Sequence, residues 1–488
     1  MKPTRLDLIL VNPGNQKLVY QGLSNTLTAI EPPLWVGLLA TTARQNGLSV
    51  KVLDAEAEGI SQDEAGRRIA AENPLLAAVI VYGSQPSAST QKMTAAGMTI
   101  RAIKEHAPDT RTLMGGVHVS ALPERTLSEE KPDFACEGEG MNTIPDLIRL
   151  LKSDDTDGLG KVAGLWYRNN GHVCSNPTAP LLKELPPMAW DLLPMDRYRA
   201  HNWHCFGGLD RQPYGLIYTT LGCPYKCSFC CINAPFGGSS YRMRSPQAVV
   251  EEIDLLVDKY GVKSIKFVDE MFVLNYRHVE AICDLLIERD YGLNIWAYAR
   301  VDTVKPYILE KLKKAGINWL ALGIESASQH VRDGVVKMTG VEDIKNTVEM
   351  IQDSGIYIIG NYIFGLPDDT MESMQETLDL AMDLNCEFAN FYCAMAYPGS
   401  KLYGLAVEKR WPMPEKWHWF SQHAMETLPL PTLKLSAGQV LKFRDEAFDK
   451  YFTNTIYLES LEKKFGRQTR EHIEGVVKHK IKRVNYDK

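Results

Sequence analysis

The sequence predicts an α/β protein in which an N-terminal, Rossmann-like doubly wound parallel sheet precedes a partial (β/α)6 barrel and a mainly helical C-terminal extension. Short apolar runs alternate with helical patterns in both halves of the chain, which favours βαβ units and parallel sheets. A proline-rich stretch without periodicity, residues 184–194, lies between the halves, and the alternation ends near Trp411. A chain of 488 residues also exceeds what one ordinary hydrophobic core organises, so several domains are expected.

The first unit contains four candidate strands with turn signals at their ends. The first strand ends in Asn12-Pro13-Gly14, and the fourth ends in Gly115-Gly116. Right-handed crossovers would place the intervening helices on both faces of the sheet. The expected strands are residues 8–11, 50–54, 77–82 and 111–114, and the expected helices include 35–45 and 90–106.

The pattern changes in the middle of the chain. Residues 165–168 and 172–174 flank Asn169-Asn170-Gly171, which is typical of a small β-hairpin. With the proline-rich stretch, this change sets the expected domain boundaries. We expect a Rossmann-like domain at 1–155, a hairpin and linker at 156–210, a barrel at 211–410 and the extension at 411–488.

The second unit contains about six β/α units, fewer than the eight of a closed barrel, so an open, partial barrel is predicted. In such sheets the chemistry gathers at the carboxyl ends of the strands. The expected strands are 215–220, 264–268, 294–298, 319–322, 357–364 and 387–396, and the helices between them include 246–260, 306–315 and 341–354. The extension contains a helix-like run at 439–452, and from its position we hypothesise that it caps the barrel mouth.

The composition of the chain argues against several classes of protein. The net charge of -6 argues against a general binder of nucleic acids or anionic membranes. No run of about 18 consecutive apolar residues occurs, and the N-terminus carries no signal-peptide core, so neither a membrane span nor export is expected. We therefore expect a cytoplasmic protein without nucleic-acid or membrane partners, and we interpret the basic C-terminal end as a solvated helix face.

The spacing of the cysteines is the most specific functional feature of the sequence. Of ten cysteines, six are scattered singly and are best explained as small buried hydrophobes, whereas four lie within residues 223–231. Cys223, Cys227 and Cys230 have the spacing C-x-x-x-C-x-x-C just after a strand. Three thiols on a four-iron cube leave one iron without a protein ligand, which lets the centre bind a substrate.

Two other metal sites compete with this interpretation. Structural zinc requires a fourth ligand, for which Cys231 or His204 could be recruited, but no second C-x-x-C pair occurs. A ferredoxin-type electron carrier would supply four cysteines. A three-cysteine [4Fe–4S] cluster fits the spacing best, with Cys231 as a bystander because adjacent thiols rarely both reach one metal.

The cysteine motif, with Phe229 before its last cysteine, resembles the radical S-adenosylmethionine superfamily, whose fold is also a partial barrel. The resemblance implies that the amino and carboxylate groups of S-adenosylmethionine chelate the open iron. One electron from the cluster then yields methionine and a 5′-deoxyadenosyl radical.

Further matches to that family follow the later strands. Residues 267–272 resemble the acidic segment that holds the amino group of the cofactor, with the choice between Asp269 and Glu270 open because the usual Gly-Gly-Glu form is absent. Arg300 follows the third strand, where a cation could pair with the cofactor carboxylate. The resemblance also implies a ribose and carboxylate contact at Glu325 and Ser326, and an adenine contact on the strand that contains Ile363.

The N-terminal unit resembles the cobalamin-binding domain of one large radical S-adenosylmethionine subgroup. Glycines at strand ends let a flat macrocycle approach the backbone. The residues implicated are Tyr82, Ser84, Gln85, Gly115, Gly116, His118, Gly138 and Glu139. The motif Asp-x-His-x-x-Gly is absent, so the cobalt would lack a histidine from that motif. The alternative is a degenerate domain retained for packing.

The resemblance implies methyl transfer to an unactivated carbon or phosphorus of a small molecule as the leading hypothesis. An external one-electron reductant such as flavodoxin or ferredoxin would reduce the cluster. The alternatives are a radical rearrangement or oxidative ring closure without methyl transfer, and, from another class, a non-catalytic iron–sulfur electron carrier. The sequence assigns no general acid or base, no substrate and no oligomeric state.

Overall fold

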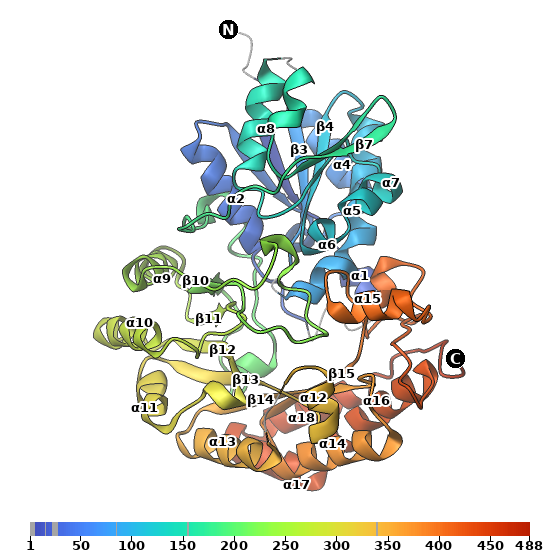
Figure 1. The fold of residues 1–488 in the computed structure, drawn as a ribbon. Coiled ribbons are helices and arrows are strands. Elements are labelled where there is room, and N and C mark those ends of the chain that lie inside the picture. The colour runs from blue at the N-terminus through green and yellow to red at the C-terminus, as the bar shows by residue number, and fades with distance from the viewer. Residues whose placement is uncertain (1–4, 15, 22–27, 84, 154–155, 338–339) are drawn as a thin grey trace.

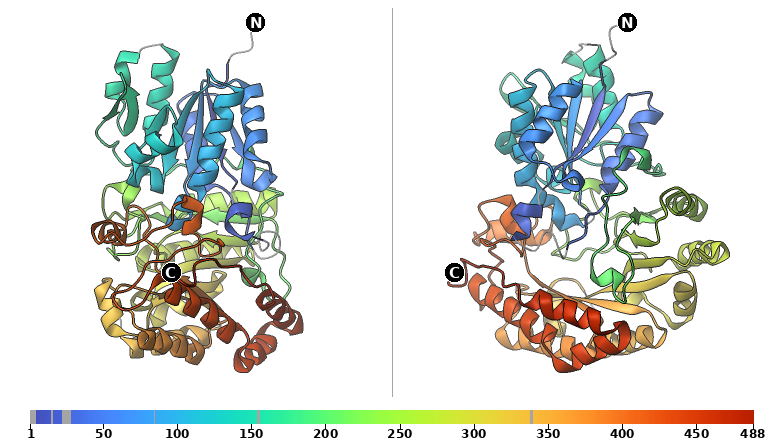
Figure 2. Two further views of the ribbon diagram at one scale, coloured as in Figure 1. Left: turned by 90° about the vertical axis from the view of Figure 1, so that its right-hand side faces the viewer. Right: turned by 180° about the vertical axis from the view of Figure 1, so that it is seen from behind.

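The computed structural model describes residues 5–14, 16–21, 28–83, 85–153, 156–337 and 340–488. Two α/β units lie one above the other, with the N-terminal unit in blue and teal and the barrel in green to orange (Figure 1). The helices of the C-terminal extension lie against the barrel (Figure 2). Within the described residues, no helix is long and apolar enough to cross a membrane.

The first sheet has the strand order β2-β1-β3-β4-β5-β6-β7, and its first five strands are parallel. The order 2-1-3-4-5 is the flavodoxin-like form of a doubly wound sheet, which has its switch point between β1 and β3. The strands are β1 (Leu8–Asn12), β2 (Val50–Asp54), β3 (Leu76–Val81), β4 (Arg111–Gly116), β5 (Phe134–Cys136), β6 (Leu165–Asn169) and β7 (His172–Ser175).

Helices cover both faces of this sheet, so the predicted doubly wound arrangement is confirmed. Alternate residues of β1 pack in different cores: Leu8 packs with α2 and α8, and Ile9 packs with α4 and α5. The helices are α1 (Gln16–Val19), α2 (Leu34–Gln45), α3 (Ala55–Glu58), α4 (Gln62–Glu72), α5 (Pro86–His106), α6 (Val117–Ala121), α7 (Pro123–Glu130) and α8 (Thr143–Lys152).

The predicted hairpin is present as β6 and β7, and it extends the first sheet instead of standing apart. β6 pairs antiparallel with β5, a three-residue strand that the sequence pattern did not predict. Because β5 is so short, its apolar run could not be distinguished from a loop by periodicity.

The second sheet consists of six parallel strands in the order β15-β14-β13-β12-β11-β8, so the partial barrel is confirmed. The strands are β8 (Tyr214–Ile217), β11 (Ser264–Phe267), β12 (Asn294–Arg300), β13 (Ile317–Glu325), β14 (Tyr357–Phe364) and β15 (Phe388–Cys393). The helices are α9 (Pro246–Tyr260), α10 (Tyr276–Arg289), α11 (Pro306–Lys314), α12 (Gln329–Gly334), α13 (Val341–Asp353) and α14 (Met371–Leu384).

The first barrel strand differs from the prediction. The run 215–220 divides into β8 and a separate two-residue strand, β9 (Thr220–Leu221), which pairs antiparallel with β10 (Arg242–Met243). Thr219 and Thr220 turn away from β8 because both donate hydrogen bonds to Asp269 at the end of β11. This turn carries the chain directly into the cysteine loop.

The C-terminal extension packs along the free edge of the barrel beside β15. Its helices are α15 (Lys401–Glu408), which precedes Trp411, and then α16 (Ala437–Phe452), α17 (Thr455–Phe465) and α18 (Arg467–Val477). From α16, Arg444 Nε donates to Phe391 O at 2.8 Å and Tyr451 Oη donates to Cys386 O at 2.7 Å. The chain then returns to the start of α16, where Gly438 N donates to Lys488 O at 2.6 Å.

Polar contacts join the two units. Gln85 Nε2 donates to Tyr298 Oη at 2.7 Å, and Lys266 Nζ lies 3.1 Å from Glu31 Oε1 with its side chain only 1% exposed. The extension also reaches the first unit, because the Trp417 ring lies edge-on to His118 with centroids 4.4 Å apart.

Candidate active site

The cysteine loop begins directly after β9 and is held by its backbone. Gly222 has φ +85°, and a Cβ there would lie 2.6 Å from Ser240 O, so a glycine is required. Further on, Ser228 N donates to Val335 O at 3.2 Å and Leu402 N donates to Ser228 O at 2.8 Å. Cys223, Cys227 and Cys230 are half-buried on this loop and line one large cavity.

The three thiols can serve as ligands of an iron–sulfur cluster. Burial raises the pKa of Cys223 to about 11, and burial also raises the pKa of Cys227 and Cys230, so a metal must displace their protons. Each of the three thiolates can bind a different iron of a four-iron cluster, which leaves the fourth iron open. The donor set therefore fits a [4Fe–4S] cluster.

The structure separates the two acidic residues after β11. Asp269 is fully buried and accepts hydrogen bonds from the backbone and hydroxyl groups of Thr219 and Thr220, so both of its oxygens are used. Glu270 lines the cavity and accepts one bond from Gly222 N at 3.2 Å. Burial raises the pKa of Glu270 to about 8. Of the two carboxyl groups, Glu270 is the one that can meet a ligand.

Arg300, at the end of β12, lies beside the cysteine loop. Its guanidinium carbon is 3.9 Å from the centroid of the Tyr225 ring, and Nε and Nη2 donate to the Asp302 carboxylate at 2.9 and 3.1 Å. The remaining Nη1 donates to Cys227 Sγ at 3.8 Å. Arg300 therefore contacts both Tyr225 and Cys227 of the cysteine loop, and Cys227 is one of the three predicted ligands of the cluster.

Glu325, at the end of β13, forms a buried ion pair with Lys337 in the cavity wall. A register shift between Gly323 and Glu325 and a φ of +67° at Glu325 turn its side chain inward. Gly323 leaves room for the pair, because a Cβ there would lie 2.4 Å from Lys337 Nζ. Ser326 is fully buried against Thr377 and lies outside the cavity lining.

Phe229 and Ile363 both line the cavity and pack in one small apolar cluster. Asn361, two residues before Ile363 on β14, also lines it and accepts a hydrogen bond from Asn390 at 3.0 Å. This part of the cavity wall therefore combines apolar side chains with one hydrogen-bonded pair of amides.

In the first unit, Gln85 and the start of α5 line the same large cavity, whereas Tyr82 lines a small adjoining cavity of about 100 Å³. Tyr82 Oη is buried without a hydrogen-bond partner, and its ring stacks on Trp35 at 4.0 Å. Ser84 lies outside the described residues.

The other predicted residues of the first unit face protein. Gly116 has φ +140° and abuts β3, because a Cβ there would lie 2.3 Å from Val81 O. His118 is 1% exposed and pairs with Thr90 Oγ1 at 3.1 Å, and burial lowers its pKa to about 3. Gly115 is likewise buried in β4. Gly115, Gly116 and His118 line neither of these two cavities, and their part in cobalamin binding stays a prediction.

Gly138 and Glu139 link the first unit to the barrel. Gly138 N donates to Ser120 Oγ at 3.0 Å, and a Cβ on Gly138 would lie 3.6 Å from Pro235 O. Glu139 is 6% exposed and forms an ion pair with Arg242 of β10. Neither residue lines the large cavity, and both lie at the contact between the units.

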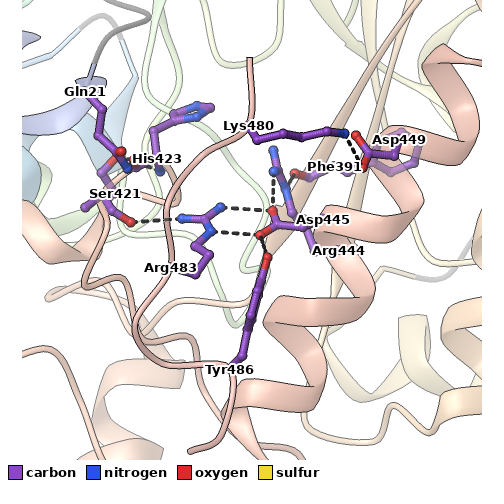
Figure 3. A network of polar contacts seen from close by, with 11 residues as sticks. Gln21, Phe391, Ser421, His423, Arg444, Asp445, Asp449, Lys480, Arg483 and Tyr486 are labelled. Atoms are coloured by element: carbon purple, nitrogen blue, oxygen red, sulfur yellow. Dashed lines mark hydrogen bonds and ion pairs between the residues drawn. The ribbon is translucent and has the colours of Figure 1, made fainter. Parts of the chain in front are cut away.

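The large cavity has a volume of about 760 Å³ and runs from the first unit past the cysteines to the C-terminal extension. Its aromatic lining includes Trp203, Trp296, Tyr298, Phe388, Phe391, Tyr392, Phe448 and Phe452. The extension contributes residues that the sequence did not predict, among them His423, Arg444 and Tyr486. Arg444, Arg483 and Tyr486 converge on Asp445, which ties the chain end to α16 (Figure 3).

Fold and site together define a two-unit α/β enzyme: a flavodoxin-like sheet and a partial barrel enclose one chamber, and a three-cysteine loop lies in its wall. The sequence model described as "Radical SAM superfamily" matches residues 217–381, and that described as "B12 binding domain" matches residues 20–148. The chain therefore combines a region that matches the radical S-adenosylmethionine superfamily with an N-terminal region that matches the B12-binding domain. The first match implies a [4Fe–4S] cluster and S-adenosylmethionine as cofactors, and the second supports cobalamin.

Individual relatives agree with this assignment. The chain is 28% identical over 454 residues to the uncharacterized methyltransferase PH0819 of Pyrococcus horikoshii, covering 92% of each chain. It is 27% identical over 382 residues to the anaerobic magnesium-protoporphyrin IX monomethyl ester cyclase of Rubrivivax gelatinosus, covering 76% of this chain and 66% of the cyclase. Among solved structures, the cobalamin-dependent S-adenosylmethionine radical enzyme OxsB shares the fold, with a TM-score of 0.71 and 16% identity over 99% of this chain and 74% of that one.

Proposed function

We propose that this enzyme is a cobalamin-dependent radical S-adenosylmethionine methyltransferase that methylates an unactivated carbon or phosphorus of a small molecule. One observation carries the proposal: a single cavity is lined both by the three cysteines of the barrel and by the start of α5 in the B12-binding region. When bound, the cluster with S-adenosylmethionine supplies a 5′-deoxyadenosyl radical, and cobalamin supplies the methyl group. The chain brings both groups into one mostly apolar chamber.

In this proposal Cys223, Cys227 and Cys230 each hold one iron of the cluster. The fourth iron stays open for the amino and carboxylate groups of S-adenosylmethionine. Cys231 is 3% exposed, and burial raises its pKa to about 12, which supports its role as a packing residue.

Glu270, Lys337 and Glu325 are the proposed contacts of S-adenosylmethionine. Glu270 presents a carboxyl oxygen beside the cysteine loop for the amino group, and Lys337 presents an ammonium group for the carboxylate. Glu325, once Lys337 turns to the ligand, can accept from the ribose hydroxyls. Ile363 offers an apolar surface for the adenine, whereas Asp269 and Ser326 keep the strand ends in place.

Cobalamin would lie between the units, with Gln85 and Tyr82 as the proposed contacts in the first unit. The unpaired Tyr82 Oη is a buried hydrogen-bonding group that a ligand can satisfy. His118 is held by Thr90 and Trp417 and supplies no cobalt ligand in this arrangement.

The first test is the cobalamin content of anaerobically purified protein from a cobalamin-supplied host, measured by absorbance. About one cobalamin per chain is expected. With S-adenosylmethionine, substrate and an external one-electron reductant such as flavodoxin or ferredoxin, we expect both 5′-deoxyadenosine and S-adenosylhomocysteine. Absence of S-adenosylhomocysteine with a true substrate would rule out methyl transfer. Cys227→Ser should lose the cluster, and Cys231→Ser should keep it.

The second candidate is a radical ring closure or rearrangement without methyl transfer. The similarity to the cyclase of Rubrivivax gelatinosus and the aromatic lining of the cavity favour it. It predicts 5′-deoxyadenosine without S-adenosylhomocysteine, so the same incubation separates the two candidates.

A further inference from the structure

Two side chains of the C-terminal extension present unpaired atoms beside the large cavity. Ser421, Gln422 and His423 line this cavity, and Gln422 Oε1 and His423 Nδ1 are buried without a hydrogen-bond partner. A buried polar atom without a partner costs free energy comparable to a lost hydrogen bond. A ligand that pairs both atoms would recover that loss.

The backbone around these two residues is fixed from opposite sides. Gln21 Nε2, from the B12-binding region, donates to His423 O at 2.8 Å, and Arg483 Nη1, near the chain end, donates to Ala424 O at 2.9 Å (Figure 3). Asn485 Nδ2 adds bonds to the carbonyl oxygens of residues 426 and 427 at 2.8 and 3.0 Å. The backbone of the segment 421–427 is therefore held from both sides.

Gln422 Oε1 and His423 Nδ1 are both uncharged, so they suit an uncharged ligand group that forms hydrogen bonds. Gln422 Oε1 only accepts, so the ligand must donate to it, and His423 offers a ring nitrogen that stays uncharged because burial lowers its pKa to about 3. The neighbouring charges of Arg483 and Asp445 neutralise each other at 2.8 and 2.9 Å. A primary carboxamide, which has both N–H donors and a carbonyl acceptor, matches this pair of atoms.

We infer that Gln422 and His423 bind a primary carboxamide at the rim of the corrin ring, so that the C-terminal extension completes the cobalamin site. The inference rests on the proposed use of cobalamin. The position of the segment favours corrin over a substrate amide, because the His423 ring lies 5.1 Å from that of Tyr20, which lines both cavities at the edge of the B12-binding region. Corrin rings carry primary carboxamides around their periphery.

The test measures the dissociation constant of hydroxocobalamin with cluster-containing full-length protein, by quenching of tryptophan fluorescence. Gln422→Leu and His423→Leu should each weaken binding by about three- to tenfold, the loss expected for one hydrogen bond. Glu426→Gln is the matched control, because residue 426 is on the same segment but outside the cavity lining, and it should bind as wild type. Circular dichroism and iron content confirm that each variant is folded.

A second probe isolates the carboxamide. Dicyanocobinamide retains the peripheral amides, whereas cobyrinic acid heptamethyl ester has no amide N–H. Wild type should prefer the amide form, and both leucine variants should lose that preference. Equal weakening toward both probes, or wild-type affinity for hydroxocobalamin, overturns the inference. Wild-type affinity with a raised substrate KM would assign the site to the substrate. Failure of wild type to bind any corrinoid would instead overturn the proposed function.

Discussion

Arg300 donates its Nη1 to Cys227 Sγ at 3.8 Å while its other nitrogens are held by Asp302. The Tyr225 ring lies against the guanidinium plane, so this cation has little freedom to turn away. The side chain is largely buried. A fixed positive charge and an N–H donor therefore lie next to one of the three cysteines proposed to hold the cluster.

Replacing Arg300 with Met should shift the midpoint potential of the cluster to a more negative value. The reduced cluster carries the extra electron, so loss of the nearby cation and of the N–H bond to Cys227 destabilises the reduced form more than the oxidised form. A redox titration followed by electron paramagnetic resonance measures the shift. Tyr225→Phe keeps the aromatic face and should leave the potential unchanged. An unchanged potential in Arg300→Met with full iron content would contradict this role.

Glu270→Gln should raise the thermal stability of the ligand-free protein at alkaline pH. Burial raises the pKa of Glu270 from its ordinary 4.5 to about 8 in the folded chain. Between these two pKa values, Glu270 holds its proton in the folded state but has lost it in the unfolded state. The free energy of unfolding of the wild type therefore falls as the pH rises through this range. The variant should therefore gain over wild type between pH 5 and about 8 and match it near pH 4. Melting temperatures of both proteins, measured across this pH range, test the prediction. A stability difference between variant and wild type that shrinks as the pH rises would contradict it.

Lys337→Met should destabilise the enzyme by about 3–5 kcal/mol, because it leaves the Glu325 carboxylate buried and unpaired. Both side chains of the pair are under 10% exposed, at 7% and 8%. The double variant with Glu325→Met should recover most of that stability, yet it should not bind S-adenosylmethionine. Urea unfolding and equilibrium dialysis measure the two effects. If the single variant is as stable as the double variant, the pair is not the buried interaction described here.

Much of the fold follows from local sequence patterns. β2 and β14 begin and end at the predicted residues, because both are rich in β-branched or aromatic residues and lie between helical patterns. α9 also has its predicted bounds, with Ser245 accepting from Ala248 N as N-cap and Gly261 as C-cap. Two features depend on pairing with distant strands, so local sequence patterns cannot predict them. They are the three-residue strand β5 and the division of β8 from β9.

The sequence predicts the site only where its residues lie close together along the chain. Three cysteines within eight positions identify the loop, but the choice between Asp269 and Glu270 depends on two threonines fifty positions earlier. His118 follows a Gly-Gly turn, as a ligand would, yet Trp417 of the extension covers it. Lys337 and residues 421–423 reach the cavity through tertiary packing, and no sequence motif around them indicates the site.

The last prediction concerns the chain end, which Asp445 ties to α16. Burial alone would raise the pKa of Asp445, but hydrogen bonds and charge from Arg483 and Arg444 lower it to about 2, so it is ionised at neutral pH. Tyr486 Oη is a third partner and donates to Asp445 at 2.8 Å, and the Arg483 side chain is only 1% exposed. Ile481 and Tyr486 line the large cavity, so this anchor also holds part of the cavity wall.

Asp445→Asn should speed amide hydrogen exchange in residues 483–488 and in 424–427, because Val484 N donates to Met425 O and loses its support when Arg483 is released. Asp449→Asn is the matched control on the same helix. Its partner Lys480 and Asp449 itself are 65% and 44% exposed, and an exposed pair contributes little. Exchange followed by mass spectrometry should therefore change in the first variant and stay at the wild-type rate in the second. Equal protection in both variants would show that backbone bonds alone, such as Gly438 N to Lys488 O, hold the chain end.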